Sequence, residues 1–258
     1  MARRTTTTST PSSTSTGAST GDDQLLARIE QLEQLLSRHG VDVPEPETTH
    51  VDLWFLLDRS GSMQSIASDV VGGFDAFIAE QRRQPGTATM TFVQFDDHDP
   101  HERIFTALPI ERVRSIAGRF QPRGSTPLYD AIGLLLDRIE RHVARGSHPA
   151  DQLVVVFTDG QENASRQWTA QRINARVADL RAAGYTFVFL GANQDSYATT
   201  RDLAMARGST ANFAASPAGV REAHRALSEN VSAYRAKRRE LRHEDESRFW
   251  DEAGKPQT

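Results

Sequence analysis

The feature that most constrains the fold is an apolar run at residues 51–57 that ends directly on Asp58-Arg59-Ser60-Gly61-Ser62. An apolar run that stops at a short, Gly-containing polar segment is typical of a buried strand followed by a tight loop. Such a strand places three small oxygen ligands on one loop, the side chains of Asp58, Ser60 and Ser62. The first loop is therefore a candidate binding site as well as a turn.

Two further segments end in the same way. Gly124-Ser125-Thr126 precedes a helical stretch, and the apolar run 153–157 leads into Thr158-Asp159-Gly160. With the first loop they supply three hydroxyls and two carboxylates, and no Cys or His. This donor set suits a hard divalent cation such as Mg²⁺ or Mn²⁺. The candidate metal ligands are Asp58, Ser60, Ser62, Thr126 and Asp159.

From His50 onwards, apolar strands alternate with amphipathic helices, which predicts an α/β fold with a doubly wound, mostly parallel six-stranded sheet flanked by helices. Strands are expected at residues 51–57, 87–95, 102–108, 151–158, 185–190 and 211–215. Helices are expected at residues 63–83, 111–120, 127–144, 168–183, 196–207 and from 217 to about 241.

The third strand follows a tight polar turn, so we expect it to be antiparallel and at the sheet edge. Ligands bind such sheets at the carboxyl ends of the strands. If the strands that end at Asp58 and Thr158 are neighbours, the five candidate ligands converge there.

The domain is expected to be flanked by extensions at both ends. Residues 1–21 are rich in Thr and Ser and predict a disordered tail, and residues 246–258 predict a flexible C-terminus. Residues 22–40 predict a short coiled-coil-like helix, joined by a linker at 41–49 to a domain at 50–245 that ends in a long helix. The helical seam consists of Leu25, Ile29, Leu32 and Leu36, and residues 22–39 are expected to bring copies of the chain together.

Composition excludes several classes of protein. The formal net charge of −4 provides no basic footprint for nucleic acid, and the absence of cysteine removes disulfides and thiolate sites. No stretch approaches the ~18 apolar residues of a membrane span. The arginines at the N-terminus are not followed by the apolar region of a secretory signal, so a cytoplasmic location is expected.

The three motifs, in this order and each at a strand-to-helix junction, resemble the von Willebrand factor A domain and its metal-ion-dependent adhesion site. The resemblance spans roughly His50 to the last helix, and Phe189-Leu190-Gly191-Ala192-Asn193 looks like the intracellular bacterial and phage members. It implies a non-enzymatic binding module in which the five candidate ligands hold Mg²⁺ or Mn²⁺. A Glu or Asp carboxylate of a partner protein would then complete the coordination of the ion.

Two alternatives stay open at this point. The same site is compatible with a metal-dependent phosphohydrolase, for which Glu162 is the only nearby acid in the motif region. The chain is also compatible with a structural assembly subunit whose metal site is vestigial. Two other polar segments are interpreted as local structure: Asp96–His101 as a solvated turn, and residues 193–195 as a helix cap.

Overall fold

The computed structural model describes residues 28, 50–146, 151–192, 203–237, 242, 249–250 and 254–256. The chain divides into two compact units, Met1–Glu47 and Thr48–Thr258. In the first unit the described part is Arg28, which is helical and exposed. Apart from that residue, the predicted tail at 1–21, helix at 22–40 and linker at 41–49 lie outside the described residues, as does the predicted cap at 193–195.

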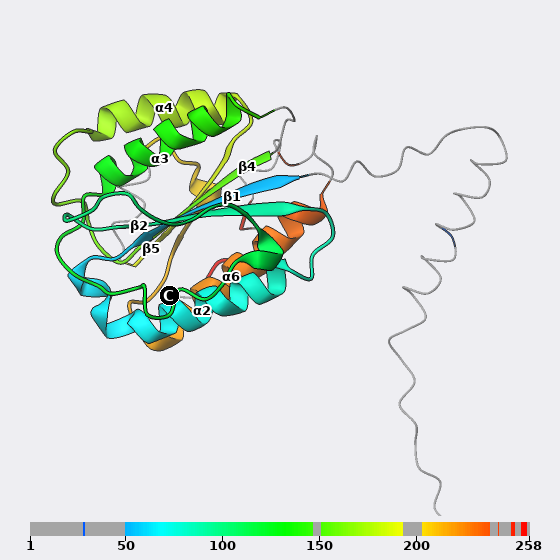
Figure 1. The fold of residues 1–258 in the computed structure, drawn as a ribbon, viewed down its shortest axis with the longest axis horizontal. Coiled ribbons are helices and arrows are strands. Elements are labelled where there is room, and N and C mark those ends of the chain that lie inside the picture. The colour runs from blue at the N-terminus through cyan, green and yellow to red at the C-terminus, as the bar shows by residue number, and fades with distance from the viewer. Residues whose placement is uncertain are drawn as a thin grey trace, which may run out of the picture. The chain divides into compact units, whose positions relative to one another are not determined.

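Within the described residues, the second unit contains a six-stranded sheet with strand order β3-β2-β1-β4-β5-β6 (Figure 1). The strands are β1 (Val51–Asp58), β2 (Ala88–Phe95), β3 (Glu102–Pro109), β4 (Asp151–Thr158), β5 (Thr186–Gly191) and β6 (Thr210–Asn212). Neighbouring strands are parallel except for β2 and β3. The predicted fold class is therefore confirmed, including the antiparallel edge strand. The structure also makes β1 and β4 neighbours, which is the condition for the five candidate ligands to converge.

Helices cover both faces of the sheet. The α-helices are α2 (Ala67–Gln81), α3 (Leu128–Val143), α4 (Ala170–Ala182) and α6 (Pro217–Ala236), and short 3₁₀ helices occur at η1 (Gly61–Ile66), η2 (Ile110–Arg112) and η3 (Arg207–Ser209). Figure 1 shows α2 and α6 on one face and α3 and α4 on the other. Alternate residues of β1 feed the two cores, with Phe55 on the α2 side and Trp54 on the α3 side. Two covered faces explain why the central strands are apolar along most of their length.

Three predicted helices differ from the structure in their described residues. The helix expected at 111–120 is wrong, because only η2 is helical there and the following residues are irregular. Val113, Ile116 and Phe120 are nevertheless buried, so the helix-like apolar spacing arises from an irregular segment packed on the core. The last helix ends at Ala236, and Lys237 has an extended backbone. Of the helix expected at 196–207, the described residues 203–206 form a turn and an irregular segment before η3.

The C-terminal part of the chain packs against the second unit. Trp250 is 1 % exposed and joins the core on the α2 and α6 side. Its backbone N–H donates to the carbonyl of Gly208 at 3.3 Å. Arg242 is also buried and forms an ion pair of 2.6 Å with Asp151 at the start of β4. Described residues on both sides of the predicted boundary at 245 are therefore buried. The buried pair at 249–250 lies within the range 246–258 for which a flexible C-terminus is expected.

Among the described helices, none combines the length and the apolar character needed to cross a bilayer.

Candidate functional site

The five predicted ligand residues meet at the carboxyl edge of the sheet. Asp58 is the last residue of β1 and Asp159 follows the last residue of β4, its parallel neighbour. Ser60 and Ser62 lie on the loop that leads into η1, and Thr126 lies just before α3. The side chains of Asp58, Ser60, Thr126 and Asp159 are buried, whereas Ser62 is exposed. The candidate site is therefore mostly buried within the domain, and Ser62 is its solvent-exposed member.

Hydrogen bonds connect the loop after β1 to the loop after β4. The hydroxyls of Ser60 and Ser62 are 3.0 Å apart, and the Ser62 hydroxyl donates to Asp159 Oδ1 at 2.7 Å. The backbone N–H of Ser60 donates to Asp58 Oδ1 at 2.7 Å. Four of the five predicted residues are therefore members of one hydrogen-bonded chain.

Thr126 reaches the same place through Gly160. A Cβ at Gly160 would lie 2.9 Å from Thr126 Oγ1 and 3.6 Å from Asp58 Oδ2, so a side chain there would crowd the threonine hydroxyl. The Thr126 backbone is held by Asn163, which accepts from its N–H at 2.8 Å and donates to its carbonyl at 3.1 Å. The loops before α3 and after β4 are thereby locked together.

Thr158 is a site residue that the sequence analysis did not select. Its hydroxyl donates to Asp58 Oδ2 at 2.5 Å, so it orients the carboxylate from the neighbouring strand. Its place in Thr158-Asp159-Gly160 is the sequence feature that could have indicated it. Its partner Asp58 is 100 residues away in the sequence, and only the pairing of β1 with β4 brings the two side chains together.

Burial dominates the electrostatics of the two carboxylates. It raises the pKa of Asp58 to about 6, against the lowering effect of the hydrogen bonds from Thr158 and Ser60. Burial also raises the pKa of Asp159, although the Ser62 hydroxyl favours its ionised form. A cation bound beside these two adjacent acids would offset the cost of ionising them, so the site favours a bound cation.

The groups that could hold a divalent cation are the side-chain oxygens of these residues. No group of three or more His, Cys, Asp and Glu residues in the described part of the chain could hold a metal ion. The candidate set differs because it combines two carboxylates with hydroxyls from Ser60, Ser62 and Thr126. Such all-oxygen sets favour Mg²⁺ or Mn²⁺ over softer metals.

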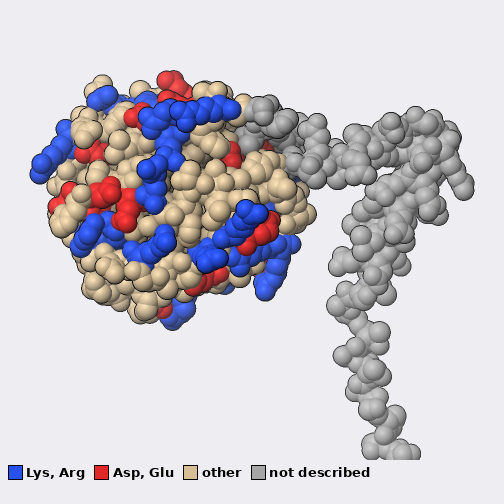
Figure 2. Space-filling view, in the orientation of Figure 1, with Lys and Arg blue, Asp and Glu red and all other residues tan. Residues whose placement is uncertain are grey.

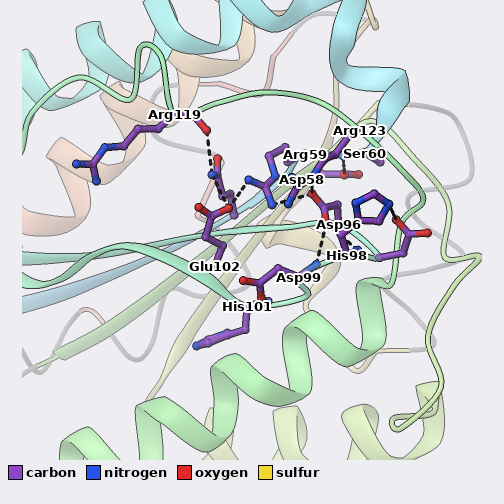
Figure 3. Close-up of polar contacts among 12 residues, drawn as sticks. Asp58, Arg59, Ser60, Asp96, His98, Asp99, His101, Glu102, Arg119 and Arg123 are labelled. Carbon is purple, nitrogen blue, oxygen red and sulfur yellow. Dashed lines mark hydrogen bonds and ion pairs between the residues drawn. The ribbon is translucent and has the colours of Figure 1, made fainter.

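Arg59, between the ligand residues of the first motif, points away from them into a charged cluster (Figure 3). It is 3 % exposed, its Nη2 lies 2.7 Å from Asp96 Oδ2, and its Nη1 pairs with Glu102. Arg123 Nε donates to the same Asp96 oxygen at 2.8 Å. Burial would raise the pKa of Asp96, but the hydrogen bond from Arg123 and the charge of Arg59 hold it below its usual value. The interpretation of Asp96 as part of a solvated turn is therefore wrong, since its carboxylate is buried between two arginines.

The backbone of the first loop is fastened on both sides. The N–H of Arg59 donates to the Phe95 carbonyl at the end of β2, and the carbonyl of Arg59 accepts from the N–H of Arg123. Gly61 N–H donates to the carbonyl of Gly124 at 3.0 Å. Gly124 has a φ of +65°, and a Cβ there would overlap the carboxylate of Asp97. Glycine is therefore required at 124 for the loop that carries Thr126 to approach this closely.

We expect Arg59→Met to lower the free energy of unfolding by about 3 kcal/mol, because it leaves the buried Asp96 with one cation instead of two. The measurement is urea unfolding at pH 7.5 in EDTA. Arg83→Met is the matched control, since Arg83 is an exposed arginine paired with Glu80 at 2.9 Å and should change stability by less than about 0.5 kcal/mol. Equal stability of the two variants would contradict a structural role for the Arg59 cluster.

Glu162, the candidate general base of the phosphohydrolase alternative, is engaged in building its own loop. Its carboxylate accepts from the backbone N–H of Tyr129 at 2.9 Å, of Ala164 at 2.9 Å and of Ser165 at 2.7 Å. It also accepts from the Ser165 hydroxyl at 2.6 Å. A carboxylate held by four donors is poorly suited to take a proton from a water.

A protein-family model described as "von Willebrand factor type A domain" matches residues 52–223, more than half of the chain. A comparison with curated proteins finds no match. Domains of the matched family typically mediate protein–protein interaction or adhesion, which agrees with a module that is not an enzyme.

Three solved structures are similar to this chain in fold. Proximal thread matrix protein 1 from the mussel byssus is 17 % identical with a TM-score of 0.49, and the match covers 80 % of this chain and 52 % of that one. A von Willebrand factor type A protein from Catenulispora acidiphila is 16 % identical with a TM-score of 0.50, covering 71 % and 43 %. The pilus adhesin SpaC from Lactobacillus rhamnosus GG is 13 % identical with a TM-score of 0.53, covering 71 % and 31 %. The match thus spans about half or less of the length of each of these proteins.

Proposed function

Because the chain belongs to the von Willebrand factor type A domain family, we propose that it is a metal-dependent protein-interaction module that binds an acidic residue of a partner protein. The metal site would be the adhesion site of this family, formed by Asp58, Ser60, Ser62, Thr126 and Asp159. The observation that carries the proposal is the hydrogen-bonded chain Ser60–Ser62–Asp159, with Asp58 and Thr126 meeting beside Gly160.

The residues present fit Mg²⁺ or Mn²⁺. The site offers oxygen atoms only, and the raised pKa of Asp58 shows a buried carboxylate whose negative charge is poorly compensated. When bound, the cation would supply an open coordination position for a carboxylate from outside the domain. Three neutral hydroxyls leave much of the charge of a divalent ion uncompensated, which strengthens its attraction for an incoming Glu or Asp.

Metal binding is tested by titrating Mn²⁺ into the full chain, followed by electron paramagnetic resonance and calorimetry. We expect Asp58→Asn/Asp159→Asn to weaken Mn²⁺ binding by about 100-fold or more, because both anionic ligands are lost. Asp137→Asn is the control: its carboxylate lies on α3 and pairs with Arg176 at 2.6 Å, outside the proposed site. Equal Mn²⁺ affinity in all three proteins would refute the proposed site.

The partner is sought by affinity capture from a lysate of the source organism, read by mass spectrometry. The wild-type chain in Mg²⁺ is compared with the wild-type chain in EDTA and with the double variant. The proposal expects a protein that only the metal-loaded wild type retains. Equal capture under all three conditions would favour the alternative of a structural subunit with a vestigial metal site.

Two further features belong to the proposal and are supported by the sequence. Self-association is proposed from the seam of Leu25, Ile29, Leu32 and Leu36, and a cytoplasmic location from the resemblance to intracellular bacterial and phage members. That resemblance rests on the segments Phe55–Met63, Thr158–Ser165 and Phe189–Asn193.

A further inference from the structure

Three arginines lie close together on the flank formed by β3 and α3. Arg103 comes from β3, and Arg138 and Arg141 come from the second half of α3. Arg103 and Arg141 are exposed and Arg138 is half-buried. Figure 2 shows a stripe of Lys and Arg side chains across the part of the molecule where Figure 1 draws α3. We call Arg103, Arg138 and Arg141 the arginine cluster.

The acidic residues of α3 do not neutralise this cluster. Asp137 and Glu140 both pair with Arg176 of α4, at 2.6 Å and 2.7 Å. In the part of the chain that the structure describes, none of the three arginines forms an ion pair with a carboxylate. The flank therefore carries three positive charges that no carboxylate among the described residues pairs with.

The arginines are near enough to affect one another. Burial lowers the pKa of Arg138, and the charges of Arg103 and Arg141 lower it further. Burial likewise lowers the pKa of His101 to about 4, with the same three arginines adding to the effect. His101 is thus neutral at pH 7, and the charge of the flank comes from the guanidinium groups alone.

The edge strand next to the cluster is irregular. Arg138 Nη2 donates to the hydroxyl of Thr106 at 3.1 Å, and the next residue, Ala107, has a φ of +42°. Here the pairing of β2 and β3 shifts register, and the Ala107 N–H donates to the Thr91 hydroxyl instead of continuing the ladder. An edge strand that contains a bulge and a residue with a left-handed backbone is a poor template for strand addition. A ligand on this flank would therefore be recognised by the arginine side chains.

We propose that the arginine cluster docks a short acidic segment of the same partner protein whose carboxylate completes the metal site. This inference rests on the proposed function. The cluster begins near the edge of the sheet that carries the metal site and runs away from it. Arg103 pairs with Val93, two residues before the end of β2, whereas Arg141 lies next to His142, which contacts Asp52 at the start of β1. A segment that leaves the metal site along this flank would reach Arg103 first and Arg141 last. Asp99 acts on the same His101 as the three arginines, so a carboxylate borders the cluster and would repel an extended polyanion. A short acidic peptide fits this patch better than a nucleic acid, which needs a continuous basic track.

The probe is a fluorescein-labelled peptide of six glutamates flanked by glycines, measured by fluorescence anisotropy at low ionic strength in EDTA. We expect Arg103→Gln/Arg138→Gln/Arg141→Gln to bind it about tenfold more weakly than the wild type, and the wild-type affinity to fall steeply with salt. The control removes the same charge elsewhere. It is Arg83→Gln/Arg221→Gln/Arg225→Gln, three exposed arginines that pair with Glu80, with Asp69, and with Glu222 and Glu229.

The outcomes separate this inference from the proposed metal site. In EDTA, Asp58→Asn/Asp159→Asn should bind the peptide at least as well as the wild type, whatever its Mn²⁺ affinity. An equal loss in the two triple variants would overturn the assignment, because it would show a response to net charge alone. Tighter binding of an oligothymidine of equal charge would overturn the choice of a protein ligand. Urea unfolding of both triple variants checks that each is folded.

Discussion

Asp58→Asn is expected to make the metal-free protein more stable at pH 7.5, by about 1–2 kcal/mol. Burial raises the pKa of Asp58 from 3.8 to about 6, so at pH 7.5 the ionised side chain opposes folding by up to ~3 kcal/mol. Asparagine removes this charge but replaces one acceptor oxygen with an amide NH₂. The hydrogen bond from Ser60 or that from Thr158 is therefore weakened, which costs about 1 kcal/mol.

The same substitution should change the pH dependence of stability. Since the pKa of Asp58 is higher in the folded state, its carboxyl is protonated in both states below about pH 4 and adds nothing there. Between pH 4 and 6 the unfolded chain loses this proton first, and above about pH 6 the full destabilisation is present. The advantage of the asparagine variant should therefore grow from pH 4.5 to pH 6.5 and then level off.

Two histidines also titrate in this range and cancel in the comparison, whereas Asp159 does not, because its charge acts on Asp58 and burial raises its pKa as well. Burial lowers the pKa of His224 and of His101 to about 4, so both histidines reduce stability as the pH falls from 6.5 to 4. Both are present in the wild type and in the variant. The measurement is the difference between their urea unfolding free energies in EDTA at several pH values, with Asp137→Asn as control. A difference that does not change with pH, or a destabilised variant at pH 7.5, would contradict the prediction.

Trp250→Ala is expected to lower the free energy of unfolding by about 3–5 kcal/mol, the usual loss for a large aromatic side chain removed from a core. Trp250 is 1 % exposed, and its ring packs edge-on against Phe249 with the ring centroids 5.1 Å apart. Its backbone also caps the segment before β6 through Gly208. A prediction from sequence alone, which places residues 246–258 in a flexible tail, expects almost no effect.

Val143→Ala provides the control for this experiment. Val143 ends α3 and is 40 % exposed, so its truncation should change stability by less than about 0.5 kcal/mol. Both variants are compared with the wild type by urea or thermal unfolding. If Trp250→Ala unfolds at the same midpoint as Val143→Ala, the C-terminal segment does not contribute to the core.

Local sequence patterns were sufficient to predict the sheet and to select the five candidate ligands. The apolar runs 51–57 and 153–157 end on polar residues where β1 and β4 reach the carboxyl edge, so Asp58 and Asp159 could be placed from their own neighbours. Periodicity failed at 111–120, where Val113, Ile116 and Phe120 have helical spacing but are buried by an irregular segment. Apolar spacing reports which residues are buried, and only backbone hydrogen bonds decide whether a helix forms.

The sequence by itself determined the alternation of strands and helices, the edge position of β3 and the positions of the five candidate residues at the junctions of strands and helices, because each depends on residues close together in the chain. Only the tertiary structure decided which distant groups meet. It paired Arg59 with Asp96, brought Thr158 onto Asp58, and buried Trp250 in the core on the α2 and α6 side of the sheet. Such contacts depend on the order of the strands and on which charged side chains become buried when the core is packed. No local pattern encodes either of these, because burial and charge pairing are properties of the assembled domain.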